Sequence, residues 1–100
     1  GRQLDAVPST ASALPGIAEA VGSQTTVIAD GGVRNGLDMV KMLALGARAV
    51  IVGRAWAWAV AAEGQAGVEN MLKVLRADAD VALALTGSNS VTELGPDSLA

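Results

Sequence analysis

Two short, continuously apolar segments constrain the fold of this chain more than any other feature. Residues 25–29 and 49–52 are rich in β-branched side chains, and each segment stops at a glycine-containing turn. Strands that are apolar on both faces are typical of parallel sheets buried on both sides. Thr26 and Val50 lie 24 positions apart with a helical pattern between them. This spacing predicts a parallel βαβ unit with a right-handed crossover.

Helical segments flank both predicted strands. Before the first strand, apolar residues recur at helical spacing after the turn residues Ser9 and Thr10, either of which can cap a helix. Asn35 is a suitable cap for the helix between the strands, and Gly46 lies just past its end. We therefore expect an α/β fold with helices at residues 11–21, between Asn35 and Gly46, from Arg54 to near Gly64, and at about 66–85.

Two parallel strands cannot close a sheet, and both would be edge strands. Hydrophobic types make up 51% of the residues and charged types 17%, so the chain is not expected to be disordered. A chain of 100 residues that folded alone would have only a marginal core. We therefore expect this chain to be a portion of a larger domain.

The composition excludes several classes of function for these residues. The chain contains no cysteine and no histidine, which excludes thiol nucleophiles, serine–histidine–aspartate triads and imidazole metal sites. A net charge of −3 argues against a dedicated nucleic-acid binder. No apolar run reaches the roughly 18 residues of a membrane span, and no signal-peptide pattern opens the chain. The expected location is the cytoplasm.

Both predicted strands end in glycine followed by arginine. The first is followed by Asp30, Gly31, Gly32, Val33 and Arg34, at a point where a helix is about to begin. Glycines allow a ligand to approach the backbone closely, a helix N-terminus offers N–H groups, and a guanidinium suits phosphate. This pattern predicts an anion site. Asp30 fits two roles equally, as an acceptor for a ligand hydroxyl or as a brace for the loop.

The second strand repeats the pattern with Gly53 and Arg54, which lead straight into a short helix. In (β/α)₈ barrels a phosphate site is often built from the loops after strands 7 and 8 and a short extra helix. Phosphate binding is therefore the predicted role of the two turns together. The alternative is a pair of ordinary turns that carry surface arginines. Near the chain start, Arg2 taken alone is a solvated cation that Asp5 could pair with.

A combination of sequence blocks resembles the FMN-dependent α-hydroxy-acid dehydrogenases and oxidases. The resemblance covers essentially the whole chain, and it is closest to the bacterial respiratory L-lactate dehydrogenases through residues 34–38 (RNGLD) and 96–99 (PDSL). The other blocks that carry it are residues 1–5 (GRQLD), 28–36 (IADGGVRNG), 44–47 (ALGA), 52–55 (VGRA), 64–68 (GQAGV) and 85–87 (LTG).

The resemblance implies that residues 1–100 are the C-terminal fragment of one FMN-binding (β/α)₈ TIM-barrel domain. The two strands would be strands 7 and 8 of that barrel. By the family pattern, Arg2 would grip the substrate carboxylate. The segments that would hold the ribityl chain and phosphate of FMN match Asp30, Gly31, Gly32, Val33, Arg34, Gly53 and Arg54.

The function implied is that of an FMN-dependent dehydrogenase that oxidises an L-2-hydroxy acid, with L-lactate to pyruvate as the first expectation. The family's general-base histidine would precede Gly1, so the isolated chain is expected to be inactive without the N-terminal portion of the barrel. Glycolate and mandelate are alternative substrates. The resemblance also leads us to expect a homo-oligomer, and it leaves open a peripheral association with the cytoplasmic face of the inner membrane.

Two alternatives lie outside this family. IMP dehydrogenases and type 2 isopentenyl-diphosphate isomerases carry a similar Asp-Gly-Gly loop after a strand, although IMP dehydrogenases usually show Gly-Ser where this chain has Gly53 and Arg54. The other alternative is a phosphate-binding fragment with no activity of its own.

Overall fold

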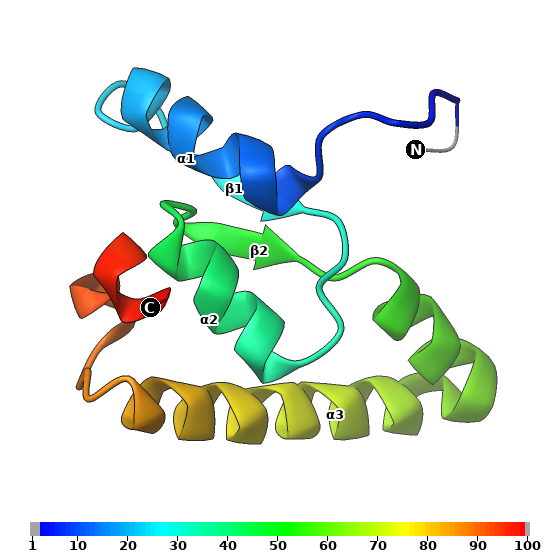
Figure 1. Cartoon of the computed structure of the whole chain (residues 1–100). Coiled ribbons are helices and arrows are strands. Elements are labelled where there is room, and N and C mark those ends of the chain that lie inside the picture. The colour runs from blue at the N-terminus through cyan, green and yellow to red at the C-terminus, as the bar shows by residue number, and fades with distance from the viewer. Residues whose placement is uncertain (1–2, 100) are drawn as a thin grey trace.

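A two-stranded parallel sheet lies at the centre of the computed structural model, which describes residues 3–99 (Figure 1). Strand β1 (Ile28–Asp30) pairs with β2 (Ala49–Ile51), and the register places Ile28 opposite Ala49 and Asp30 opposite Ile51. A backbone hydrogen bond of 2.8 Å from Arg48 N to the Val27 carbonyl continues the contact before the strands begin. The parallel βαβ unit predicted from the sequence is confirmed, with shorter strands.

Helix α1 (Thr10–Val21) precedes the sheet, and α2 (Gly36–Ala44) connects its two strands. Ser9 caps α1, because its hydroxyl accepts a hydrogen bond from the Ser12 N–H. Asn35 caps α2, as predicted from the sequence. Both caps use a short polar side chain at the residue before the helix, where the backbone is still extended.

Helix α3 (Arg54–Leu85) follows β2 and consists of two helical parts. The backbone leaves the helical region at Glu63 and at Gly64, whose φ of 58° and ψ of −132° favour glycine. A short helix therefore precedes a long one, as the sequence predicts. Two 3₁₀ turns, η1 (Val91–Glu93) and η2 (Pro96–Leu99), complete the described chain. Within residues 3–99, no helix has the length and apolar character needed to cross a membrane.

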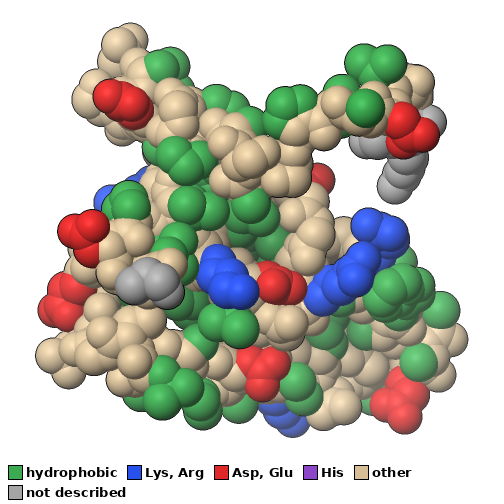
Figure 2. Space-filling view, viewed as in Figure 1, with side chains coloured by type: hydrophobic (Ala, Val, Ile, Leu, Met, Phe, Trp, Pro, Cys, Tyr) green, Lys and Arg blue, Asp and Glu red, His purple; other side chains and the backbone are tan. Residues whose placement is uncertain are grey.

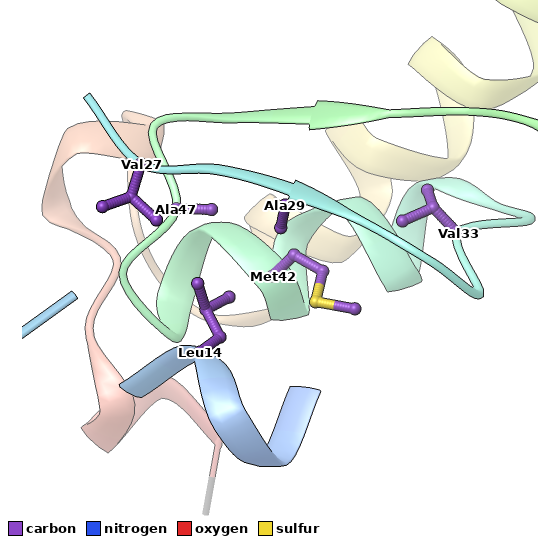
Figure 3. Close-up of a cluster of buried hydrophobic side chains, with 6 residues drawn as sticks. All are labelled: Leu14, Val27, Ala29, Val33, Met42 and Ala47. Atoms are coloured by element: carbon purple, nitrogen blue, oxygen red, sulfur yellow. The ribbon is translucent and has the colours of Figure 1, made fainter. Parts of the chain in front are cut away.

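The hydrophobic core lies between one face of the sheet and the helices α1 and α2. Figure 3 shows Ala29 of β1 directed toward Met42 of α2 and Leu14 of α1. Ala29 is 2% exposed, so this face of β1 is sealed by the two helices. The long part of α3 does not cover the sheet but packs against α2. The helices thus form layers on one side of the strands.

The opposite face of the sheet is open, which corrects the prediction that both strands are buried on both faces. Ile28 is 55% exposed and Ile51 is 52% exposed. Strand side chains alternate between faces, so these two residues point away from Ala29 and the helices. Within residues 3–99, no helix or strand covers that face. The sequence correctly shows apolar residues on both faces, but the described residues cover only one of them.

Close contacts at two glycines set the position of α3. A Cβ atom at Gly36, the first residue of α2, would collide with the backbone nitrogen of Ala79 in the long part of α3. A Cβ atom at Gly67 would collide with the carbonyl oxygen of Ala59 in the short part. The long part of α3 therefore touches the backbone of α2 and of the short helix without intervening side chains.

We expect Gly36→Ala to destabilise the complete protein by about 1–3 kcal/mol, because the added methyl group must push two helix backbones apart. Thermal unfolding measures the effect. Gly16→Ala in α1 is the matched control, since a Cβ there meets no atom within 4 Å. A helical glycine replaced by alanine in open space gains up to about 1 kcal/mol. Equal melting temperatures for the two variants would contradict the close packing of α2 on α3.

Candidate functional site

The two glycine–arginine turns meet at the carboxyl ends of the paired strands. The register that places Asp30 beside Ile51 brings the turn after β1 next to the turn after β2. A cavity of about 170 Å³ lies between them. Its lining includes all seven residues predicted from the sequence to hold a cofactor, together with Ile51. They are Asp30, Gly31, Gly32, Val33, Arg34, Ile51, Gly53 and Arg54.

The turn after β1 depends on its glycines. Gly31 has a φ of 109° and Gly32 a φ of 80°, a region that side-chain-bearing residues rarely adopt. At Gly31 there is also no room for a Cβ, because it would lie 2.8 Å from the hydroxyl oxygen of Thr10. The loop is therefore held against the start of α1 while it curves around the cavity.

Gly53 is a glycine for a different reason. Its φ of −92° is open to other residues, and a Cβ there would meet no atom within 4 Å. Packing within residues 3–99 does not require a glycine at this position. Because Gly53 lines the cavity, its missing side chain leaves space inside the cavity itself.

Two arginines give the cavity a positive character. Arg34 and Arg54 both line it and are both exposed. Among residues 3–99 the only ion pair is Arg76–Asp80 at 3.8 Å, so neither cavity arginine has a carboxylate within salt-bridge distance. Figure 2 shows basic side chains on the side of the molecule where the loop after β1 meets the start of α3. Two unpaired guanidinium groups beside one polar cavity suit a phosphate.

The N-terminus of α3 is the helix end best suited to an anion. It begins after Gly53 with no side-chain cap and no acidic residue in its first turn. Helix α2, which follows Arg34, was predicted to offer its N-terminal N–H groups to an anion, but its start is already capped. In α2 the Asn35 side chain accepts the Asp38 N–H at 2.8 Å, and the Asp38 carboxylate adds negative charge to the first turn. The positive end of the α3 dipole remains for a ligand.

Val33 and Arg2 differ from the other predicted site residues. Val33 lines the cavity but is only 4% exposed and is part of the core, where Figure 3 shows its side chain. Arg2, predicted to grip a substrate carboxylate, lies outside the described residues. Ile51 was not among the predicted site residues, although the alternation of the strand carries it to the open face beside the cavity.

Asp38, which the sequence places in the first turn of the helix after Asn35, also has a partner in the loop before that helix. Its Oδ2 accepts a hydrogen bond from the backbone N–H of Arg34 at 3.1 Å. A signal was present in the sequence, because a carboxylate in the first turn of a helix often reaches back to the N–H groups at its start.

A model of the family described as FMN-dependent dehydrogenase matches residues 1–100, which is the whole chain. The chain belongs to the FMN-dependent dehydrogenase family. The resemblance inferred from the sequence blocks is confirmed by this match, and the cavity residues lie within the matched region. The match also favours this family over the IMP dehydrogenase alternative.

Curated members of the family are similar over the same length. The L-lactate dehydrogenase of Azorhizobium caulinodans is 58% identical over 99 residues, which are 99% of this chain and 26% of that protein. The L-lactate dehydrogenase of Caulobacter vibrioides is 57% identical over 100 residues, which are 100% of this chain and 26% of that protein. The chain thus spans about a quarter of the length of the curated relatives it matches.

Solved structures in the family have the same local fold. A variant of (S)-mandelate dehydrogenase superposes with a TM-score of 0.88 at 42% identity, covering 95% of this chain and 26% of its own. A mandelate oxidase variant with a monooxide FMN adduct gives a TM-score of 0.85 at 43% identity, covering 89% of this chain and 28% of its own. The α/β arrangement of strands and helices described above is therefore that of the family.

We expect Gly53→Ala to weaken FMN binding by the complete protein with little change in its thermal stability, because the added methyl group would occupy cavity space and meets no atom of residues 3–99 within 4 Å. Fluorescence titration of FMN measures the affinity. Gly95→Ala is the matched control, since a Cβ there also meets nothing within 4 Å and Gly95 lies outside the cavity. Wild-type FMN affinity in Gly53→Ala would show that the ligand does not approach this glycine.

Proposed function

We propose that this chain is the C-terminal quarter of an FMN-binding (β/α)₈ barrel in an L-2-hydroxy-acid dehydrogenase that oxidises L-lactate to pyruvate. In this proposal β1 and β2 are strands 7 and 8 of the barrel. The single observation that carries the proposal is the cavity at the strand ends, which Arg34, Gly53 and Arg54 line together. The names of the relatives at 53–58% identity support L-lactate as the substrate.

The two faces of the sheet support the assignment to a barrel. In a (β/α)₈ barrel the helices pack outside the strands, and the strand side chains that point inward form a packed interior. Here α1 and α2 cover the same face, while Ile28 and Ile51 are exposed on the other. The exposed isoleucines are the side chains that the barrel interior would bury.

The cavity residues fit the phosphate end of FMN. Arg34 and Arg54 would neutralise the phosphate, and the open space at Gly53 would admit it close to the start of α3. The Asp30 carboxylate lines the same cavity and would accept hydrogen bonds from the ribityl hydroxyls. FMN supplies the acceptor for the two electrons that leave the substrate.

Lactate oxidation also requires groups for the substrate itself. Oxidation to pyruvate removes two electrons and two protons, and the hydroxyl proton must pass to a base. The chain contains no histidine, so we propose that the base belongs to the remainder of the barrel. Arg2 would hold the lactate carboxylate through the paired N–H groups of its guanidinium.

We propose L-lactate rather than mandelate as the substrate because of the sequence identities to the relatives. Proteins named L-lactate dehydrogenase are 53–58% identical to the chain, whereas the mandelate oxidase and mandelate dehydrogenase structures are 40–43% identical. We expect L-lactate to bleach the flavin absorbance of the complete protein under anaerobic conditions faster than D-lactate, glycolate or (S)-mandelate. Faster bleaching by glycolate or mandelate would reassign the substrate, and no bleaching by any of them would overturn the reaction class.

Arg34→Ala and Arg54→Ala should each weaken FMN binding about ten- to a hundredfold, the equivalent of one hydrogen bond to a charged group. Riboflavin lacks the phosphate, so its affinity should change little. The ratio of the two dissociation constants measures the phosphate contribution. Arg76→Ala is the control, because Arg76 pairs with Asp80 on α3 and lies outside the cavity. An unchanged ratio in both cavity variants would refute the phosphate assignment.

Arg2→Lys should raise the KM for L-lactate and lower kcat while FMN stays bound, because lysine cannot form the two parallel hydrogen bonds of arginine to a carboxylate. Steady-state kinetics and the flavin content of the purified variant test this together. Wild-type kinetic constants would remove Arg2 from the substrate site.

A further inference from the structure

We propose that Asp38 is a positioning residue for the phosphate site, which it serves by fixing the backbone of Arg34. The inference rests on the proposed function, in which Arg34 binds the FMN phosphate. Asp38 does not line the cavity and would not touch the flavin. Its effect passes through a hydrogen bond to the residue that does.

Reciprocal hydrogen bonds tie the start of α2 to the loop before it. The Asp38 Oδ2 accepts from the Arg34 backbone N–H at 3.1 Å, and the Asp38 backbone N–H donates to the Asn35 Oδ1 at 2.8 Å. The acceptor in the first bond is a carboxylate, and charge-assisted hydrogen bonds are stronger than neutral ones. The helix therefore holds the loop at the peptide unit that joins Val33 to Arg34.

The same peptide unit is held from its other side by packing. The side chain of Val33 is 4% exposed and belongs to the core with Met42 and Ala29. Burial of Val33 and the bond to Asp38 together restrain the backbone on both sides of the peptide. The Cα of Arg34 consequently has a defined place beside the cavity, although its side chain is exposed.

The bond also determines which part of Arg34 can serve a ligand. Its backbone N–H is already used by Asp38, so the guanidinium is the donor that Arg34 has left for a phosphate. A flexible arginine loses conformational freedom on binding, and a fixed backbone reduces that loss. Asp38 thus contributes to affinity by preorganisation of Arg34.

The negative charge of Asp38, considered alone, would lower the affinity for a phosphate rather than raise it. Asp38 places a negative charge in the first turn of α2, near a cavity proposed to hold a phosphate, and like charges repel. If repulsion were the dominant effect, removing the carboxylate would strengthen FMN binding. Positioning predicts that removing it weakens FMN binding, so the direction of the change separates the two.

The test compares FMN and riboflavin affinities in the complete protein, stripped of flavin and titrated with each compound. Asp38→Ala should weaken FMN binding about three- to tenfold, the equivalent of the ordering cost of one flexible side chain. Riboflavin affinity should stay at the wild-type value. Asp38→Ser, which keeps a helix-starting polar side chain that is too short to reach Arg34, should show the same loss and covers the case in which the alanine variant does not fold.

Asp38→Asn separates the hydrogen bond from the charge, since the amide oxygen can still accept from Arg34 while the negative charge is gone. It should restore FMN affinity to the wild-type value or above. Glu93→Ala is the matched control, because Glu93 accepts the Asn89 backbone N–H at 2.8 Å over the same four-residue spacing, away from the cavity. It should leave both flavin affinities unchanged.

Several results would overturn the proposal. These are FMN affinity at or above wild type in Asp38→Ala, equal losses for FMN and riboflavin, an asparagine variant as weak as the alanine variant, or the same loss in Glu93→Ala. The proposed phosphate site fails separately. In that case Arg34→Ala would leave the ratio of FMN to riboflavin affinity at the wild-type value, whatever the Asp38 variants do.

Discussion

The parallel pairing of β1 with β2 is the constraint on which the rest of the structure depends. In a parallel pair both carboxyl ends lie at the same edge, and the register of Asp30 with Ile51 aligns them. Arg34 and Arg54 are distant in the sequence and share a cavity only because of that alignment. The pairing is supported from one side by the core of α1 and α2, where Ala29 meets Met42. The position of the cavity at the strand ends thus depends on the packing of the sheet against α1 and α2.

Local signals made most of the fold predictable. Ser9 and Asn35 act as caps because each bonds an N–H only three residues away, and such a short-range choice can be read from neighbours in the sequence. The exposure of one face of the sheet could not be predicted from such local signals. Ile28 and Ile51 are apolar whether or not something covers them, and exposure depends on distant parts of a fold.

The site was predictable to the extent that it lies in the two turns. Glycine and arginine at the strand ends pointed to residues that the structure brings to one cavity, but the pattern did not show that Val33 is also part of the core. Val33 lines the cavity and is also a buried member of the hydrophobic core. The difference between the starts of α2 and α3 was partly readable, because Asn35 was predicted as a cap, but the hydrogen bond from the Arg34 N–H to the Asp38 carboxylate was not predicted.

The long part of α3 contacts both segments that carry the cavity arginines at positions where one partner is glycine. At Gly36 it touches the helix that follows the Arg34 loop, and at Gly67 it touches the short helix that begins at Arg54. The backbones that carry Arg34 and Arg54 are therefore linked through the long part of α3 as well as through the strand pairing. A sideways displacement of that part of the helix would move both arginine-bearing segments together.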